Sequence, residues 1–87
     1  MEKIPNILIY SKENCAYCQW AKQFFDAKQL KYTEIRVDLH PDKLAEMIQI
    51  AARRTTPQIV INNKAIGGYD DLIALSKSGE LTELLKN

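Results

Sequence analysis

Two cysteines separated by two residues stand where one predicted element ends and the next begins. Residues 6–10 include an apolar run with the length and composition of a buried strand. Further on, apolar residues recur at positions 17, 20, 21, 24 and 25, which predicts a helix over about residues 16–28. Cys15 therefore falls at or just before the first helical turn, and Cys18 falls one turn further in.

The start of a helix is a favourable place for a thiolate. Its first N–H groups have no partner within the helix, and together with the macrodipole they stabilise negative charge. We therefore expect the Cys15 thiol to ionise more readily than an ordinary cysteine, with Lys12 adding positive charge nearby. Cys18 lies deeper among apolar residues and should stay protonated. This asymmetry predicts an attacking Cys15 and a resolving Cys18.

Length and charge limit the classes of protein to consider. A chain of 87 residues suggests one domain spanning residues 1–87. The net charge of +1 gives no reason to expect binding to nucleic acid or to an anionic membrane. No apolar run approaches the roughly 18 residues of a membrane span, and residues 1–5 lack the apolar core of a signal peptide. We therefore expect a cytoplasmic protein, in which two close cysteines are more often catalytic or metal-binding than structural.

The remaining patterns predict an α/β fold. We expect further strands over residues 30–37, 58–61 and 64–66, helices over about 41–51 and 69–77, and a weaker helical turn over 80–86. Asn62 and Asn63 indicate a hairpin between the last two strands. The order β-α-β-α-β-β-α predicts a mixed four-stranded sheet flanked by helices, with the first two strands parallel. Trp20, Phe24 and Phe25 are predicted to lie in the core. A C-x-x-C motif beside such a βαβ unit is typical of a thioredoxin-like redox site.

Three separated blocks carry a resemblance to a known family. Residues 10–12, which lead to Cys-Ala-Tyr-Cys at 15–18, are similar to a segment that ends in C-P-Y-C. Residues 54–57, Arg-Thr-Thr-Pro, are similar to R-T-V-P, and residues 67–71, Gly-Gly-Tyr-Asp-Asp, are similar to G-G-x-D-D. With all three in order and at the family's spacing, the chain resembles a dithiol glutaredoxin along nearly its whole length.

The resemblance implies a glutathione-dependent thiol–disulfide oxidoreductase of the thioredoxin fold. Cys15 would attack a protein disulfide or a protein–glutathione mixed disulfide. A second glutathione would then release the intermediate, or Cys18 would resolve it and leave a Cys15–Cys18 disulfide. Glutathione, kept reduced by an NADPH-linked glutathione reductase, would restore the dithiol. The implied partners are glutathione and oxidised or glutathionylated proteins, and the implied state is a monomer.

The resemblance also implies a glutathione site around the cysteines. Tyr17 would pack on the ligand, and a cis Thr56–Pro57 bond would turn the Thr56 backbone toward the cysteine of glutathione. Lys12 and Arg54 would meet the glycyl carboxylate, although Arg53 competes with Arg54 for that place.

The γ-glutamyl end of glutathione would lie at the start of the helix that follows Gly68 and Tyr69. There the Asp70 N–H would meet its carboxylate, and Asp71 would accept from its ammonium group. A plain helix-capping role for Asp70 and Asp71 is equally open, and Gly68 would allow a close approach.

Two departures from the family pattern leave alternatives open. Ala16 stands where the family usually has proline, and Thr56 stands where it usually has valine. Some glutaredoxins without that proline bridge a [2Fe–2S] cluster as dimers, so Cys15 is also a candidate cluster ligand. A redoxin reduced by thioredoxin reductase is the rival enzyme. A self-contained zinc site is disfavoured because His40 is the one further soft ligand.

Overall fold

The computed structural model describes residues 4–86. In chain order its elements are β1 (Ile7–Ser11), α1 (Ala16–Ala27), β2 (Thr33–Arg36), α2 (Pro41–Ala51), β3 (Gln58–Ile61), β4 (Lys64–Gly67), α3 (Tyr69–Ser78) and α4 (Glu80–Leu85). The predicted order of strands and helices is confirmed, and the weak final turn forms the short helix α4. Among residues 4–86, no helix is both long and apolar enough to cross a membrane.

The four strands form one mixed sheet in the order β2-β1-β3-β4. β1 pairs parallel with β2 and antiparallel with β3, and β3 pairs antiparallel with β4. The predicted hairpin between β3 and β4 is confirmed: Asn62 and Asn63 both have positive φ angles, 49° and 69°, as a tight turn between twisted strands requires.

β2 is shorter than predicted, beginning at Thr33 rather than at residue 30. The reason lies at the end of α1, where the Leu30 N–H donates to the carbonyl of Phe25 at 3.0 Å. Gln29 turns the chain there with a φ of 58°. Leu30 therefore closes the helix, and its side chain packs against the core instead of extending the sheet.

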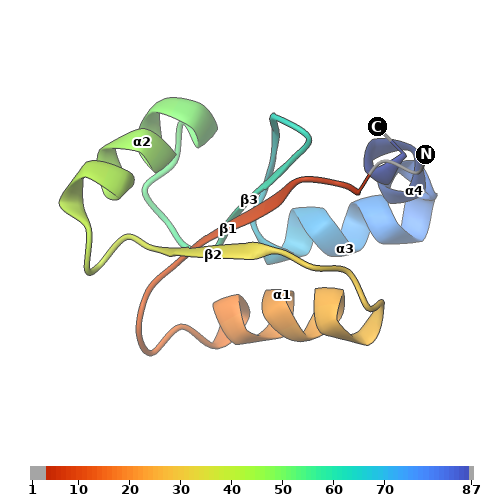
Figure 1. Cartoon of the computed structure of the whole chain (residues 1–87), viewed down its shortest axis with the longest axis horizontal. Helices are drawn as coiled ribbons and strands as arrows, with labels where there is room; N and C mark the ends of the chain where they lie inside the picture. Colours follow the sequence, from red (N-terminus) through yellow and green to blue (C-terminus); the bar gives the residue numbers. More distant parts are fainter. Residues whose placement is uncertain (1–3, 87) are drawn as a thin grey trace.

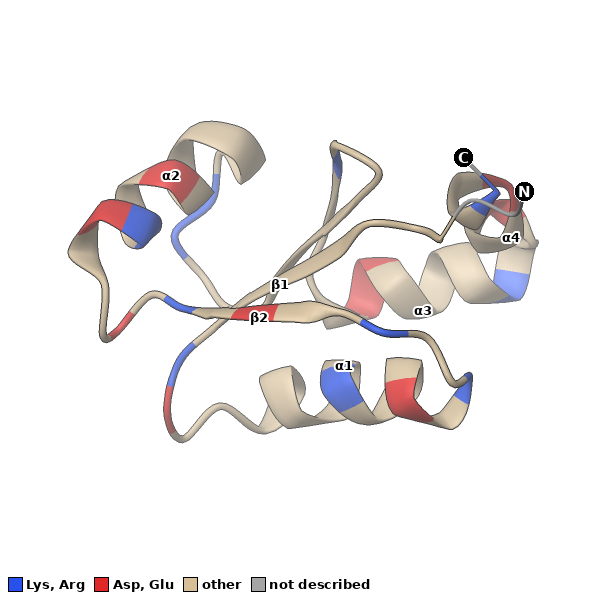
Figure 2. Ribbon diagram, in the orientation of Figure 1, with Lys and Arg blue, Asp and Glu red and all other residues tan. Residues whose placement is uncertain are grey.

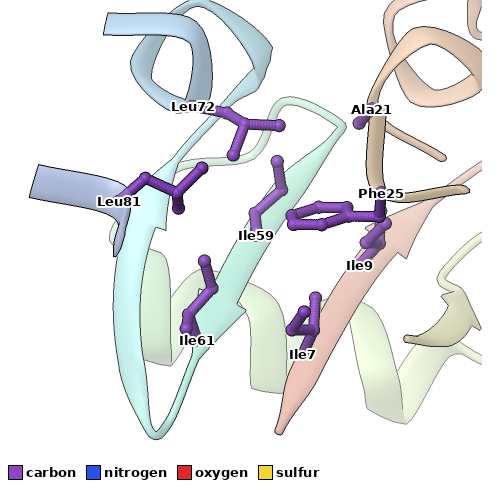
Figure 3. Close-up of a cluster of buried hydrophobic side chains, with 8 residues drawn as sticks. All are labelled: Ile7, Ile9, Ala21, Phe25, Ile59, Ile61, Leu72 and Leu81. Atoms are coloured by element: carbon purple, nitrogen blue, oxygen red, sulfur yellow. The ribbon is translucent and has the colours of Figure 1, made fainter. Parts of the chain in front are cut away.

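Alternation along the strands produces two buried layers, one on each face of the sheet. Every second residue of β1 and β3 faces α1, α3 and α4, and α2 covers the opposite face (Figure 1). The larger layer, drawn in Figure 3, consists of Ile7, Ile9, Ala21, Phe25, Ile59, Ile61, Leu72 and Leu81. Its contributions from β1, β3 and three helices hold α1 against the sheet.

The layer beneath α2 is smaller and contains Tyr10, Val37, Met47 and Val60. The Tyr10 hydroxyl donates to Glu46 of α2 at 2.6 Å. Burial, together with this bond, raises the pKa of Tyr10 to about 12. Tyr10 therefore stays neutral at physiological pH and anchors α2 to the centre of the sheet.

The prediction that Trp20 lies in the core is wrong, because 47 % of this residue is exposed. Phe25 is fully buried, and Phe24 is partly buried against the core. The buried side of α1 consists of Cys18, Ala21 and Phe25, at the i, i+3, i+7 spacing of one helical face. Trp20 precedes Ala21 by one residue, about 100° around the helix, and so it points outward.

Candidate active site

The two cysteines meet at the N-terminus of α1, just beyond the end of the central strand β1 (Figure 1). Cys15 is the N-cap residue, and its Sγ accepts a hydrogen bond from the Cys18 N–H at 3.2 Å. The two residues form a disulfide with a Cα–Cα distance of 5.2 Å. Cys18 is completely buried, whereas Cys15 is partly exposed. An incoming thiol or disulfide therefore reaches the sulfur of Cys15 first.

Thr56 faces Cys15 from the loop that precedes β3. The Thr56–Pro57 peptide bond is cis, as the resemblance implies. The hydroxyl and the main-chain carbonyl oxygen of Thr56 each lie 3.7 Å from Cys15 Sγ. In the disulfide form the hydroxyl is the donor of this pair, since an oxidised sulfur carries no proton. In the dithiol form the Cys15 thiol can donate to the carbonyl.

A groove of about 230 Å³ opens beside this pair. It is lined by Tyr17, Arg53, Thr55, Thr56, Pro57, Gln58, Gly68, Tyr69, Asp70 and Asp71. Three segments far apart in sequence thus converge on one site: the start of α1, the loop before β3 and the start of α3. Most of the residues predicted to bind glutathione line this groove.

Lys12 and Arg54 are placed elsewhere. Lys12 lines a second groove of about 610 Å³ on the other side of the cysteine pair, together with Cys15 and Ala16. Arg54 is exposed and lines neither groove. Arg53 lines the first groove together with Thr56, and Arg54 does not.

Asp71 joins Arg53 to the start of α3. Its Oδ2 atom accepts from the N–H of the N-cap residue Gly68 at 2.9 Å and from Arg53 Nη1 at 2.9 Å. These donors, the Gly68 N–H first, hold the pKa of Asp71 below its usual value. In a capping box, the N3 side chain accepts from the N-cap N–H, and the N-cap side chain accepts from the N3 N–H. Gly68 has no side chain, so only the first of these two bonds forms here. The capping role considered from sequence is thus present for Asp71.

Gly67 is required immediately before this turn. Its φ of 108° is one that residues with a side chain rarely adopt. A Cβ atom at this position would also collide with the Asp71 carboxylate. At Gly68, by contrast, φ is −91° and an added Cβ would lie 3.4 Å from the Pro57 carbonyl oxygen. The backbone conformation therefore does not require glycine at position 68, and an added Cβ would touch Pro57 at about van der Waals distance.

Three aromatic rings continue the wall of the first groove toward solvent. Tyr17 contacts Trp20 edge-on, with ring centroids 5.0 Å apart, and lies 6.0 Å from Tyr69. Trp20 and Tyr69 are 5.8 Å apart. About half of Tyr17 and of Trp20 is exposed. The cluster bridges α1 and α3 and presents apolar surface next to the disulfide.

Two ionic networks hold the chain on either side of the second groove. Glu34 accepts from the buried Ser11 hydroxyl at 2.6 Å and from Lys22 at 2.9 Å, and these contacts, Ser11 first, lower its pKa. Asp38 accepts both a two-pronged contact from Arg36 and the Glu13 N–H. The end of β1 is therefore tethered to β2 by a side-chain bond, and the segment between β1 and Cys15 is tethered to the turn after β2.

Charges of both signs are distributed over the helices and loops, as Figure 2 shows. Lys12 and Glu13 follow one another just before Cys15, and Arg53 pairs with Asp71 on the other side of the disulfide. A neutral or zwitterionic ligand suits such surroundings better than a polyanion.

Sequence reasoning assigned Gln58 no role beyond that of an ordinary strand residue, although it lines the first groove and is only 1 % exposed. A polar residue at the head of the otherwise apolar run Gln-Ile-Val-Ile was the available signal, because a buried glutamine needs hydrogen-bond partners.

Comparisons with known proteins point to one family. Residues 7–66 match the family model described as Glutaredoxin. The chain is 44% identical over 83 residues to glutaredoxin 3 of Escherichia coli (strain K12), covering 95% of this chain and 100% of that protein. It is 40% identical over 82 residues to a glutaredoxin of Pseudomonas aeruginosa, covering 94% of this chain and 98% of that protein.

Solved structures show the same architecture. A crystal structure of a buckwheat glutaredoxin–glutathione complex superposes with a TM-score of 0.83 at 31% identity, covering 93% of this chain and 76% of that chain. The solution structure of a glutaredoxin from Brucella melitensis gives 0.80 at 40% identity, covering 93% and 88%. The predicted thioredoxin-like fold is confirmed.

Proposed function

The chain belongs to the glutaredoxin family and is a glutathione-dependent disulfide oxidoreductase with a Cys15–Cys18 dithiol centre, and we propose that its substrates are protein disulfides and protein–glutathione mixed disulfides. One observation supports the proposal most directly. The partly exposed Cys15 sulfur lies at the helix N-terminus, with the Thr56 carbonyl 3.7 Å away at the edge of a peptide-sized groove. A thiol-containing peptide can there meet both a reactive sulfur and an open main-chain edge.

The order of burial supports Cys15 as the nucleophile. In the reduced enzyme the Cys15 thiolate attacks the glutathione sulfur of a mixed disulfide. A Cys15–glutathione disulfide forms, and the protein thiolate leaves and takes up a proton. A glutathione thiolate then attacks the glutathione sulfur of this intermediate, which releases oxidised glutathione and regenerates Cys15.

Protein disulfides require the second cysteine. Cys15 first forms a mixed disulfide with one substrate sulfur, and the other substrate sulfur leaves as a thiolate. Cys18, whose N–H already lies 3.2 Å from Cys15 Sγ, then attacks Cys15 and releases the fully reduced substrate. The product is the Cys15–Cys18 disulfide, the form that the structure presents. Two glutathione molecules reduce it and leave as oxidised glutathione.

We place glutathione in the first groove, with its cysteine paired to the Thr56 main chain and packed on Tyr17 and Pro57. The buckwheat relative was crystallised as a complex with glutathione. At the γ-glutamyl end, Asp71 uses Oδ2 for Gly68 and Arg53, which leaves the acceptor capacity of Oδ1 to the ligand ammonium. The Asp70 N–H, at the start of α3 after Tyr69, suits the α-carboxylate.

The glycyl carboxylate has three candidate partners. Lys12 and Arg54 were predicted from the resemblance, and Arg53 lies closest to the groove by its place in the lining. Arg53 is already paired with Asp71, so its charge is partly compensated. Single alanine variants of the three, compared by KM for glutathione, identify the partner as the variant whose KM rises most.

A paired enzyme assay tests the function. A glutathionylated peptide is reduced in the presence of glutathione, glutathione reductase and NADPH, with a parallel run that supplies thioredoxin reductase instead. We expect turnover only, or mainly, in the glutathione run. Turnover only with thioredoxin reductase would retain the Cys15–Cys18 chemistry and reject the glutathione site.

Three further predictions extend beyond the family assignment. We propose that residues 1–87 act as a single monomeric domain and that the protein works in the cytoplasm, where glutathione is kept reduced. A [2Fe–2S] cluster is a separate alternative: Cys18 is fully buried, so each chain would offer Cys15 alone and glutathione would supply the other thiolates. A brown dimer after anaerobic purification is the result that supports a cluster.

A further inference from the structure

Gln58 is a buried polar residue that touches the loop facing Cys15. It is 1 % exposed and opens β3, where it pairs with Tyr10 of β1. Its Nε2 donates to the Thr55 carbonyl at 3.0 Å and lies 3.3 Å from the Thr55 hydroxyl. The carbonyl fixes the orientation of the amide, because the opposite orientation would set two oxygens against one another.

The loop that Gln58 contacts has few other polar attachments. Within residues 4–86, no main-chain hydrogen bond of the turn-and-loop type ties residues 53–57 to another segment. Arg53 reaches out to Asp71, and Thr56 contacts Cys15. In the disulfide form, where the Cys15 sulfur has no proton to donate to the Thr56 carbonyl, the bond from Gln58 is therefore the side-chain attachment that acts on the main chain of this loop within the described residues, one residue before Thr56.

The other end of the Gln58 amide has no such use. Its Oε1 atom is buried and finds no hydrogen-bond partner within the described part of the chain. A buried acceptor without a partner lowers stability, so an apolar residue of similar shape would serve a purely structural role at least as well. The presence of glutamine here is better explained by what its Nε2 does to the loop.

We propose that Gln58 is a positioning residue, which holds the Thr55 carbonyl so that the Thr56 main chain and hydroxyl stay aligned with Cys15. The role rests on the proposed function only where it concerns glutathione. Thr55 is exposed, so without this bond its carbonyl can accept from water instead of from Gln58. The main chain at Thr55 is then free to change its orientation. The main chain of Thr56 would then become ordered only when a substrate binds, and the free energy needed to order it would lower the affinity for the substrate.

The substitution Gln58→Met tests this role, because methionine is unbranched, of similar length and unable to donate. We expect the KM for a glutathionylated peptide to rise about fivefold, as for the loss of one hydrogen bond, with kcat little changed. The melting temperature should be unchanged or higher, since the orphaned acceptor is removed as well. Gln49→Met, the same substitution at an exposed position of α2, should behave like the wild type in both measurements.

A second readout does not depend on glutathione. In the disulfide form the Thr56 hydroxyl donates to Cys15 Sγ at 3.7 Å. The same contact, kept after reduction, would favour the thiolate. We expect the rate of iodoacetamide alkylation of Cys15 at neutral pH to fall about threefold in Gln58→Met and to stay unchanged in Gln49→Met. Should Gln58→Met not fold, Gln58→Leu, which is also apolar and has no donor, replaces it with the same expectations.

The outcomes separate this inference from the proposed function. A raised KM and slower alkylation at an unchanged melting temperature support the positioning role. A lower melting temperature, with KM and alkylation rate as in the wild type, shows that Gln58 is merely structural and overturns it. If the wild type does not turn over the glutathionylated peptide, the proposed substrate is wrong, and the alkylation rates alone decide the role of Gln58.

Discussion

The two cysteine sulfurs differ in environment, although they are three residues apart and joined by a bond. Cys15 sits at the N-cap with its sulfur against Thr56, where N–H groups and a hydroxyl favour a thiolate. Cys18 lies on the buried side of α1 beside Ala21. The difference in exposure assigns attack to one residue and resolution to the other.

Replacing the resolving cysteine separates the two reactions. We expect Cys18→Ser to keep at least about half of the wild-type kcat/KM on a glutathionylated peptide, because glutathione itself resolves that intermediate. The variant should lose reduction of a protein disulfide, which needs an internal second thiol. Both rates come from the glutathione reductase-coupled assay.

The matched control is Cys15→Ser, which should bring both rates to background because no exposed thiolate remains. Equal loss of both activities in Cys18→Ser would contradict the glutathione-resolved route. Residual activity in Cys15→Ser would show that the nucleophile is assigned wrongly.

At the scale of elements, the start of α3 is shaped by a single carboxylate. Asp71 bonds the N–H of Gly68 and pairs with Arg53, so it joins the helix, the turn at Gly67 and the loop before β3. An acidic residue in the first turn also complements the helix dipole. The geometry of the groove thus depends on how one helix begins.

The substitution Asp71→Ala removes the cap and the ion pair together. We expect the free energy of unfolding to fall by about 1 kcal/mol at pH 7, the usual size of a capping effect. The Asp71 pKa is lower in the folded protein. Its contribution is therefore complete above an unfolded pKa of about 4, and it is lost as pH falls through the lower folded pKa.

Urea unfolding at pH 7 and at pH 3 measures this effect. The gap between wild type and variant should shrink at the lower pH. Asp70→Ala, at the exposed neighbouring position, serves as the control and should change stability by less. A gap that stays constant between the two pH values would show that the carboxylate charge does not act in the cap.

At the scale of the whole molecule, two apolar layers on opposite faces of one sheet hold the structure together (Figures 1 and 3). The larger layer joins residues from β1, β3, α1, α3 and α4, and the smaller one attaches α2. The disulfide closes only a short loop, with a sequence separation of 3. Stability should therefore come mainly from the layers, so that the protein stays folded in both redox states, as a catalyst that cycles between them requires.

Reduction of the disulfide tests this division of roles. From the length of the closed loop we expect the free energy of unfolding to fall by no more than about 2 kcal/mol. The measurement is urea unfolding followed by far-ultraviolet circular dichroism, with and without dithiothreitol. Loss of the cooperative transition on reduction would mean that the layers alone do not sustain the fold.

The order and type of the elements could be predicted because their signals are local. A short continuous apolar run marks β3, the spacing of Tyr17, Ala21 and Phe25 marks α1, and Pro41 begins α2. The position of Cys15 at a helix start follows from the same periodicity. No local signal showed that Leu30 closes α1, and so the start of β2 was predicted three residues too early.

The details of the groove were decided by tertiary structure, because they depend on how distant segments meet. Ala52 ends α2 with a φ of 58°, a conformation that its residue type does not predict, and the chain leaves that turn with Arg53 facing Asp71. Packing of α1 against the sheet turned Trp20 outward, and Gln58 gained its role only where β3 meets the preceding loop. Sequence by itself determined which elements form and where the reactive sulfur sits, because those signals are local. Tertiary packing alone decided how the surrounding side chains are arranged and which of them bond to one another, because these contacts join distant segments.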